Sequence, residues 1–307
     1  MQKNPSNANN PLNEKKSPVD VVVYGEVLYD CFPDERRVLG GAPFNTAWGL
    51  TGFGHNPLFI SAVGEDEGGA NIRQKMAAWG MSTSGLQTND DYATGEVFVT
   101  INGDEPSYEV CAPRAWDCIN DSGFSAQSLI YHGLLSLRDE RSSNTLKSII
   151  QRSSAKRFFD VNLRPPYDSL DTLYEWIKSV CWLKLNIDEL AILLQVESIS
   201  FCNSVPYVDQ LIERFDIENV LLTGGSQGAL IRGRYGFAMC APAPTPDRFV
   251  DTVGAGDSFS AFAIHGILTG LPVQQIIEQA SHFASKVCGL QGATTDSKEF
   301  YTKQITS

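Results

Sequence analysis

Short apolar runs, each followed by a polar or glycine-bearing turn, recur along the chain from Val19 onward. The first is VVVYG, and the later ones are SLIYHGLL, AKRFFDVN, CWLKLN and NVLLTGG. Stretches with apolar residues at helical spacing, such as SFSAFAIHGIL, lie between several of these runs. Alternating strands and helices are typical of α/β domains. The pattern predicts a single α/β domain over residues 19–307 with a mostly parallel central sheet.

A different pattern occupies residues 93–113, where TGEVFVTINGDEPSYEV alternates apolar and polar positions around an Asn-Gly pair. This arrangement is typical of an exposed β-hairpin. Val97, Val99 and Ile101 share one face of it, and a lone two-stranded ribbon cannot bury them all. We therefore expect this flap to need a partner surface. Before it, Asn71 to Trp79 reads as a helix.

The terminal residues and the composition of the chain limit the kinds of partner it can bind and the cellular compartment it suits. Residues 1–18 have no apolar core like that of a signal peptide and predict a mobile tail, and no run approaches the roughly 18 apolar residues of a membrane-spanning helix. A net charge of −12 argues against a nucleic-acid partner. Seven cysteines without a CxxC pair fit reduced thiols. These features predict a cytoplasmic protein that binds neither nucleic acid nor membrane.

The stretch DTVGAGDSF, from Asp251 to Phe259, places a Gly-Ala-Gly turn at the start of an apolar helix. Backbone N–H groups at such a start lack partners and face outward, next to the positive end of the helix dipole. Phosphate groups bind at such positions, and Asp257 would lie beside one, able to accept a proton from a hydroxyl. On motif grounds alone, an ordinary helix start is the favoured interpretation, because Asp is a common N-cap residue and Gly a common turn former.

Several polar or glycine residues follow the predicted strands. In open parallel sheets, ligands bind beyond the carboxyl ends of the strands, so these residues are expected to converge there. They are Asp30, Asn162, Asn186, Gly225 and Asp257.

Two long segments carry a resemblance to a known family. GGAPFNTAWGLTGFGHNPLFISAVG, from Gly40 to Gly64, and DTVGAGDSFSA, from Asp251 to Ala261, resemble the two signatures of the ribokinase-like, or pfkB, carbohydrate kinases. KLNIDEL and LLTGGSQGAL, between them, resemble two further elements of that family. The similarity covers Val19 to about Thr294 and implies a three-layer α/β/α domain with a small β-sheet lid, whose strands come from about residues 27–39 and 93–113.

The resemblance assigns chemistry to the glycine-rich turn. Gly254, Ala255 and Gly256 would form, with the amide of Asp257, an anion hole for the transferring phosphoryl group, and Asp257 would be the catalytic base. A monovalent cation such as K+ would assist the anion hole. Its expected ligands are Asp251, Val253 and Gly292, with carbonyls near Val287 and Leu290.

The resemblance also implies ATP and Mg²⁺ as cofactors. Asn186 and Glu189 would hold Mg²⁺ through water, although the same spacing fits a helix-start Asn with a capping-box Glu. Lys184 would lie near phosphate. The nucleotide-binding strand and turn would contribute Thr223, Gly225 and Gly228.

For the sugar, the family places Asp30 and Asn45 against hydroxyls, and Gly40 and Gly41 let the backbone approach the ring. FDVNLRP, which carries Asp160, Asn162 and Arg164, resembles a stretch of fructokinases and ketodeoxygluconate kinases in which the Arg lies near substrate or phosphate. Without the family motif, Asp30 could merely end a strand and Asn45 merely cap a helix.

The resemblance implies an ATP-dependent kinase, with fructose as the favoured acceptor and fructose 6-phosphate as product. The alternatives are ribose, a 2-keto-3-deoxy sugar acid, a nucleoside, or a non-catalytic sugar-binding regulator on the same fold. Similar kinases close their lid over the sugar, and several pair two lids across a dimer, which implies a homodimer. Phe262 departs from the small residue usual after the catalytic loop, and His282 stands near a position where relatives contact the nucleotide, so base contacts stay unassigned.

Overall fold

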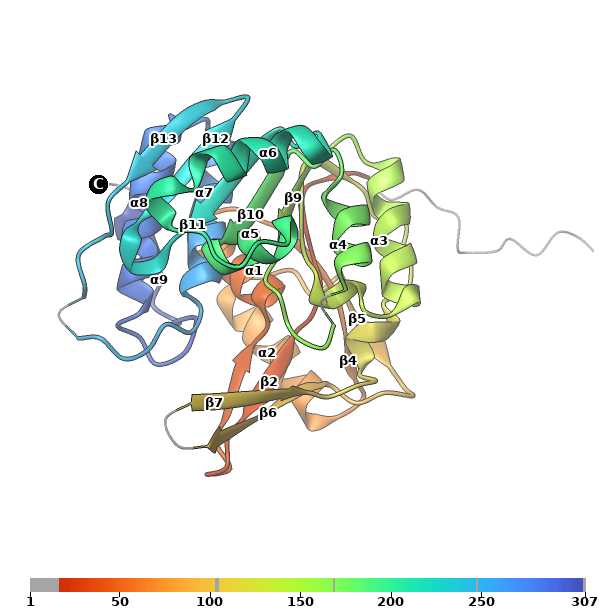
Figure 1. The fold of residues 1–307 in the computed structure, drawn as a ribbon. Coiled ribbons are helices and arrows are strands. Elements are labelled where there is room, and N and C mark those ends of the chain that lie inside the picture. The colour runs from red at the N-terminus through yellow and green to blue at the C-terminus, as the bar shows by residue number, and fades with distance from the viewer. Residues whose placement is uncertain (1–16, 103–104, 168, 247, 306–307) are drawn as a thin grey trace, which may run out of the picture.

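A nine-stranded sheet forms the centre of the molecule in the computed structural model, which describes residues 17–102, 105–167, 169–246 and 248–305 (Figure 1). Seven strands run parallel, and the last two add as an antiparallel hairpin. The prediction of a mostly parallel α/β sheet is confirmed. The strand order is β13 (Gly236–Cys240), β12 (Ala229–Gly233), β11 (Asn219–Thr223), β10 (Trp182–Asn186), β9 (Lys156–Asp160), β8 (Ala126–Gly133), β1 (Val19–Tyr24), β4 (Leu58–Gly64) and β5 (Leu86–Asn89).

Helices cover both faces of this sheet, which gives three layers (Figure 1). One face carries α1 (Ala42–Gly52), α2 (Glu67–Trp79), α7 (Ala255–Thr269), α8 (Val273–Val287) and α9 (Lys298–Ile305). The other carries α3 (Glu140–Arg152), α4 (Leu170–Ile177), α5 (Ile187–Leu194) and α6 (Val205–Phe215). None of the described helices is long and apolar enough to span a membrane.

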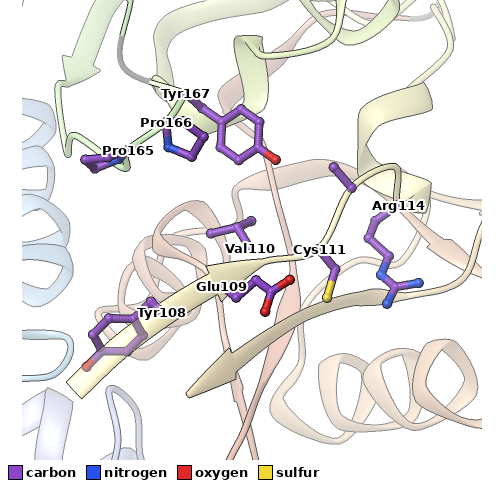
Figure 2. A pocket seen from close by; sticks show the side chains of 9 residues that line it. Tyr108, Glu109, Val110, Cys111, Arg114, Pro165, Pro166 and Tyr167 are labelled. Atoms are coloured by element: carbon purple, nitrogen blue, oxygen red, sulfur yellow. The ribbon is translucent and has the colours of Figure 1, made fainter. Parts of the chain in front are cut away.

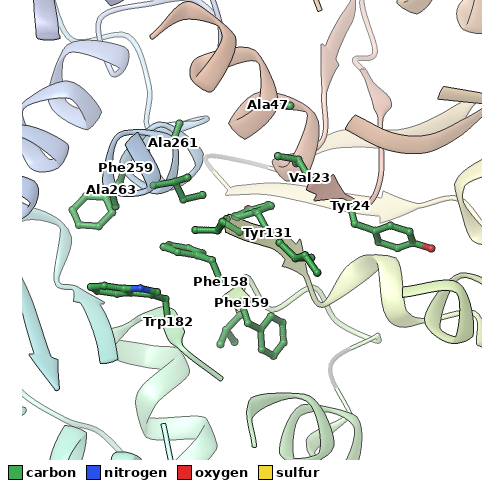
Figure 3. Packing of buried hydrophobic residues seen from close by; sticks show 14 of the residues in the cluster. Val23, Tyr24, Ala47, Tyr131, Phe158, Phe159, Trp182, Phe259, Ala261 and Ala263 are labelled. Carbon is green, nitrogen blue, oxygen red and sulfur yellow. The ribbon is translucent and has the colours of Figure 1, made fainter. Parts of the chain in front are cut away.

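The core lies between the sheet and these layers because the central strands are buried on both faces. Tyr131, Phe158 and Trp182 come from three adjacent strands and pack in one layer (Figure 3). Phe262, whose direction the sequence left open, is fully buried, and its ring contacts those of Phe53 and Phe283. It therefore belongs to the core.

Helices α1 and α7 pack closely enough to set the geometry of the site. A Cβ atom placed on Gly49 of α1 would lie 2.8 Å from the Cβ of Ala261 in α7. Only glycine permits this approach, because real Cβ contacts are longer. The contact holds the first turns of the two helices side by side, and these turns carry Asn45 and Asp257.

A second, four-stranded sheet projects below the central sheet in Figure 1. Its order is β3 (Arg37–Gly40), β2 (Leu28–Cys31), β6 (Gly95–Asn102) and β7 (Glu105–Val110). The hairpin of β6 and β7 forms as the alternation predicts, while residues 103–104 of its turn lie outside the described residues. We call this sheet the lid.

Three expectations need correction or qualification. Asp30 lies within β2 of the lid and not at the end of a central strand, because the chain leaves the central sheet after Tyr24. Helix α2 begins at Glu67, since Asp66 caps it by accepting a hydrogen bond from the Gly69 amide (2.8 Å). The tail predicted for residues 1–18 falls almost wholly outside the described residues.

The expectation that a lone lid leaves its apolar face uncovered is wrong for two of its three residues. Val97 and Val99 are only 5% and 4% exposed within a single chain, and the side chain of Ile101 lies outside the described residues. On the opposite face Phe98 is 45% exposed, whereas Tyr108, which pairs with Val99 and shares its face, is itself 52% exposed. A second copy is therefore not needed to bury Val97 and Val99.

Candidate active site

The glycine-rich turn opens α7 in the manner that the sequence suggests. Gly254 precedes the helix in the left-handed region (φ 77°), and a Cβ atom there would lie 2.3 Å from the Cβ of Ala293. Glycine is required on both counts. The Ala255 amide, however, donates to the Thr252 carbonyl at 3.1 Å. It is thus already paired, which corrects its assignment to the anion hole.

The N–H groups of Gly256 and Asp257 stand in the first turn of α7, where an α-helix offers them no acceptor. Lys184, in the middle of β10, adds a positive charge directly beneath. Its Nζ lies 3.2 Å from the position that a Cβ atom of Gly256 would take. Helix dipole, amides and ammonium group together favour an anion at this point.

A buried ion pair holds that ammonium group in place. Lys184 Nζ donates to both carboxylate oxygens of Asp160, at 2.9 and 3.1 Å, and Ser260 of α7 donates to the same carboxylate at 2.8 Å. Burial would lower the pKa of Lys184, but the neighbouring carboxylates outweigh it and raise that pKa. Lys184 therefore stays charged, and Asp160 connects β9, β10 and α7 beneath the turn.

Asp257 is joined to α1 by a side-chain hydrogen bond. Asn45 Nδ2 donates to Asp257 Oδ2 at 2.8 Å. Burial raises the pKa of Asp257, and the nearby Asp160 adds to the effect, while the bond from Asn45 opposes it. A carboxylate with an elevated pKa beside an anion-binding turn has the properties of a general base.

Asp30 approaches the same region from the lid. Its Oδ2 lies 3.2 Å from the position of a Cβ atom on Gly40, so a side chain at Gly40 would crowd the carboxylate. Gly41, with φ 107°, brings its Cα close to the Glu26 carbonyl, which would lie 2.7 Å from a Cβ atom. Burial raises the pKa of Asp30 to about 6. The structure thus brings Asp30, Gly40, Gly41, Asn45 and Asp257 to one region.

Glu26 belongs to this region, although the sequence analysis passed over it. The side chain is 3% exposed, and its Oε2 has no hydrogen-bond partner among the described residues. Burial raises the pKa of Glu26 to about 7, with a further increase from the negative charge of Asp257. The only sequence signal was an acidic residue directly after the glycine that follows the first strand.

Arg164 provides the positive charge of this carboxylate cluster. It lowers the pKa of Glu26, Asp30 and Asp257, against the larger effect of burial in each case. The side chain is exposed, and its Nη1 donates to the Leu163 carbonyl at 2.8 Å. It therefore lies within electrostatic reach of three carboxyl groups.

A cavity of about 580 Å³ lies between lid strand β7 and the loop that follows Arg164. Figure 2 shows Pro165, Pro166 and Tyr167 of the loop on one side and residues of β7 and the segment after it on the other. Glu109 and Arg114 supply polar groups, and Tyr108 and Tyr167 supply aromatic ones. Its size falls within the usual range for small-molecule sites.

Asn186 and Glu189 form the capping box that their spacing also allowed. Asn186 Oδ1 accepts from the Glu189 amide at 2.9 Å, and Glu189 Oε2 accepts from the Asn186 amide at 2.8 Å. The other oxygen of Glu189 accepts from the Leu163 amide at 2.9 Å. Both carboxylate oxygens are already engaged, so the pair suits a cation held through water better than direct coordination.

The predicted nucleotide turn, residues 223–228, folds back on itself after β11. The Gly224 amide donates to the Gly228 carbonyl at 2.8 Å, and the Gly228 amide donates to the Gly225 carbonyl at 3.2 Å. A Cβ atom on Gly225 would meet nothing within 4 Å, so this residue faces open space. Thr223 ends β11 directly before the turn.

The segments expected to hold a monovalent cation are adjacent, since the Gly254 turn contacts Ala293. Asp251 Oδ1 accepts from the Val253 amide at 2.8 Å, and the Val287 carbonyl accepts from the Leu290 amide at 2.9 Å. Gly292 takes a left-handed conformation (φ 87°). The expected ligands, a carboxylate and backbone carbonyls, are oxygen donors, which suit a hard cation. No group of three His, Cys, Asp or Glu ligands occurs among the described residues.

Residues 19–299 match the model of the pfkB family of carbohydrate kinases. The chain belongs to this family. It is 28% identical to a fructokinase of Salmonella typhimurium, over 89% of this chain and 93% of that protein. The expected ribokinase-like fold and the expected enzyme class, a sugar kinase, are therefore confirmed.

Solved structures show the same fold at low sequence identity. A fructokinase of Vibrio cholerae O395, crystallised with fructose, ADP and a calcium ion, is 21% identical, with a TM-score of 0.77 over 91% of this chain and 95% of that one. An aminoimidazole riboside kinase of Salmonella enterica is 20% identical, with a TM-score of 0.78 over 94% of this chain and 100% of that one.

Proposed function

We propose that this sugar kinase transfers the γ-phosphoryl group of ATP to fructose and forms fructose 6-phosphate. The observation that carries the proposal is the meeting of Asp257 and Asn45 at the first turn of α7, with Lys184 beneath that turn. The similarity to the Salmonella typhimurium fructokinase supports fructose as the acceptor.

The first turn of α7 stabilises the group in transit. Phosphoryl transfer spreads negative charge over the equatorial oxygens, and preorganised donors and cations lower its free energy. The amides of Gly256 and Asp257, with the Lys184 ammonium group below, supply such charge without rearrangement. Mg²⁺, when bound through water near Asn186 and Glu189, would neutralise the phosphates of ATP.

Asp257 accepts the proton of the attacking hydroxyl. Its pKa is raised by burial, which increases its basicity, and the bond from Asn45 fixes one of its oxygens. Asp30 binds further hydroxyls from the lid side, where Gly40 leaves room for its carboxylate. Arg164 balances part of the negative charge.

ATP enters from the side of the central sheet that carries Thr223, Gly225 and Gly228. The open space beside Gly225 permits close approach of a nucleotide. A monovalent cation such as K+ between Asp251, Val253 and Gly292 would add positive charge behind the anion hole. A homodimer that pairs two lids would cover Phe98, an exposed aromatic residue on the lid face opposite Val97 and Val99.

A nucleoside is the second candidate acceptor. The cavity beside Arg164 extends the site along β7, and Tyr108 and Tyr167 could contact a flat ring there. The structural similarity to the aminoimidazole riboside kinase supports this alternative.

A panel of sugars and nucleosides, assayed for ADP release with Mg-ATP, separates the two candidates. Fructose is expected to give the highest kcat/KM. A nucleoside with a higher value would replace fructose as the acceptor, and no release above the acceptor-free rate would favour a non-catalytic regulator.

A further inference from the structure

Glu26 is a buried acid that the mechanism above does not use. It lies between β1 and β2, where the chain passes from the central sheet to the lid, and is 3% exposed. A buried carboxyl oxygen without a partner is costly, because it gives up its hydration and gains nothing in return. Natural proteins keep such groups mainly where a ligand or water completes them.

The backbone around Glu26 fixes where its side chain begins. A Cβ atom on the preceding Gly25 would lie 2.4 Å from Pro43 of α1, and a Cβ atom on Gly41 would lie 2.7 Å from the Glu26 carbonyl oxygen. The Ala42 amide at the start of α1 lowers the pKa of the Glu26 carboxyl, so the group lies near this helix end. The Glu26 carboxyl thus lies beside the start of α1, and its Oε2 is left without a hydrogen-bond partner among the described residues.

Asn45 of α1 carries a second buried hydrogen-bond acceptor that has no partner in the described part of the chain. Asn45 is 8% exposed and gives its Nδ2 to Asp257, while its Oδ1 has no hydrogen-bond partner among the described residues. Glu26 and Asn45 thus offer two unsatisfied acceptors beside the proposed base. A ligand that completes both must present at least two hydrogen-bond donors, as a polyol does.

We propose that Glu26 is a substrate-binding residue, which accepts a hydrogen bond from a second hydroxyl of the acceptor sugar while Asp257 acts on the one to be phosphorylated. The inference rests on the proposed sugar kinase reaction at Asp257. It adds a specificity contact that Asp30, Asn45 and Arg164 do not provide.

The charge of the cluster also selects the class of acceptor. Glu26, Asp30 and Asp257 contribute three carboxyl groups, against which stand Arg164 and Lys184, and Lys184 is already paired with Asp160. Arg37 of β3 and Arg114, which follows the lid, are both paired with Glu96, at 2.9 and 3.0 Å. A carboxylate or phosphate on the acceptor would add negative charge here, so the site favours a neutral polyol over a sugar acid or a sugar phosphate.

Because Glu26 titrates, the affinity for the sugar is expected to depend on pH. Asp257 from α7 and Arg164 from the loop after β9 are the charged groups that act on it, and burial sets its pKa at about 7. A hydroxyl donor binds the ionised carboxylate, so affinity for the sugar is expected to rise with pH through about 7. Asp30 adds a similar step near its own pKa of about 6.

The test compares Glu26→Gln with wild type and with Glu65→Gln, a matched change at an exposed glutamate. Glu26→Gln should raise KM for the sugar by about 10- to 100-fold, the usual effect of losing a hydrogen bond to a charged group. The kcat and the KM for ATP should change less than about threefold. The step in sugar KM near pH 7 should vanish while the step near pH 6 remains, and Glu65→Gln should behave as wild type.

Monodeoxy analogues of the accepted sugar identify the hydroxyl. One analogue should bind wild type more weakly than the parent sugar does. The same analogue should bind Glu26→Gln about as well as the parent sugar does, because the carboxylate that accepts from the missing hydroxyl is already gone. Glu26→Asp, which retracts the carboxyl by one methylene, replaces Glu26→Gln if the amide variant does not fold. An unchanged sugar KM in a folded, active variant overturns the inference alone, whereas a wild type that phosphorylates no sugar overturns the proposed function as well.

Discussion

Replacing Asp257 by Asn removes the proposed proton acceptor and leaves its shape. The side-chain oxygen of Asn can still accept the 2.8 Å hydrogen bond from Asn45 Nδ2, and Gly256 and Lys184 keep their places. Anion binding at the turn should therefore survive. The rate of the chemical step should not, because no proton acceptor remains at that position.

The size of the loss follows from the role of Asp257. General base catalysis contributes about 10²- to 10⁴-fold, which corresponds to about 2.7 to 5.4 kcal/mol in the barrier. Amides of α7 and the Lys184 charge act on the phosphoryl group and not on the proton, so they set the residual rate. We expect kcat to fall by about 10²- to 10⁴-fold, with the KM values for sugar and ATP within a few fold of wild type.

The direction in which Asp257→Asn changes the free energy of unfolding also follows from the structure. Burial raises the pKa of Asp257, so the native state favours its protonated form. The stability linked to this raised pKa is full below the unfolded pKa and declines as pH rises through the folded pKa. At neutral pH the Asn variant should therefore be at least as stable as wild type. A thermal melt checks this and separates lost chemistry from lost folding.

The assay is ADP release at saturating sugar and Mg-ATP, with Asp188→Asn as the control. Asp188 is an exposed acid in the first turn of α5, so its change matches the chemistry and the helix position. A folded Asp257→Asn enzyme that keeps kcat within about threefold of wild type refutes the assignment of the base.

Three further expectations concern neighbouring groups. Asp30→Asn should raise KM for the sugar about 10-fold or more and hardly change KM for ATP, and an equal rise in both would count against a role in sugar binding. Lys184→Met should lower the free energy of unfolding by about 3–5 kcal/mol in chemical denaturation, because it leaves Asp160 buried without its cation, and a loss below about 1 kcal/mol would contradict this reasoning. Phe98→Asp should shift a lid-paired homodimer to monomer in sedimentation, whereas a wild type that is monomeric at micromolar concentration rules that dimer out.

Local signals in the sequence were sufficient for parts of the site that depend on one segment. The glycine turn before Asp257 and the Asn186 to Glu189 spacing are read from a few adjacent residues, because helix starts have short-range rules. The structure shows a helix start at each place. It also shows that Asn186 and Glu189 cap α5, which the spacing alone could not separate from metal binding.

Features that depend on long-range packing could not be read in this way. Glu26 sits in a run that resembles a continuing strand, and only the passage of the chain from one sheet to the other reveals it as a buried acid. The burial of Val97 and Val99 depends on lid packing that alternation does not encode. The pairing of Lys184 with Asp160 joins residues 24 positions apart on adjacent strands.

The central claim is that this enzyme phosphorylates fructose with ATP at its 6-hydroxyl. Phosphorus NMR of a reaction of purified protein with Mg-ATP and fructose measures both the transfer and its position. The account predicts growth of one sugar phosphate signal, identified as fructose 6-phosphate, in step with ADP. A phosphate at another position, or ATP unchanged beside fructose while another acceptor is phosphorylated, would contradict it.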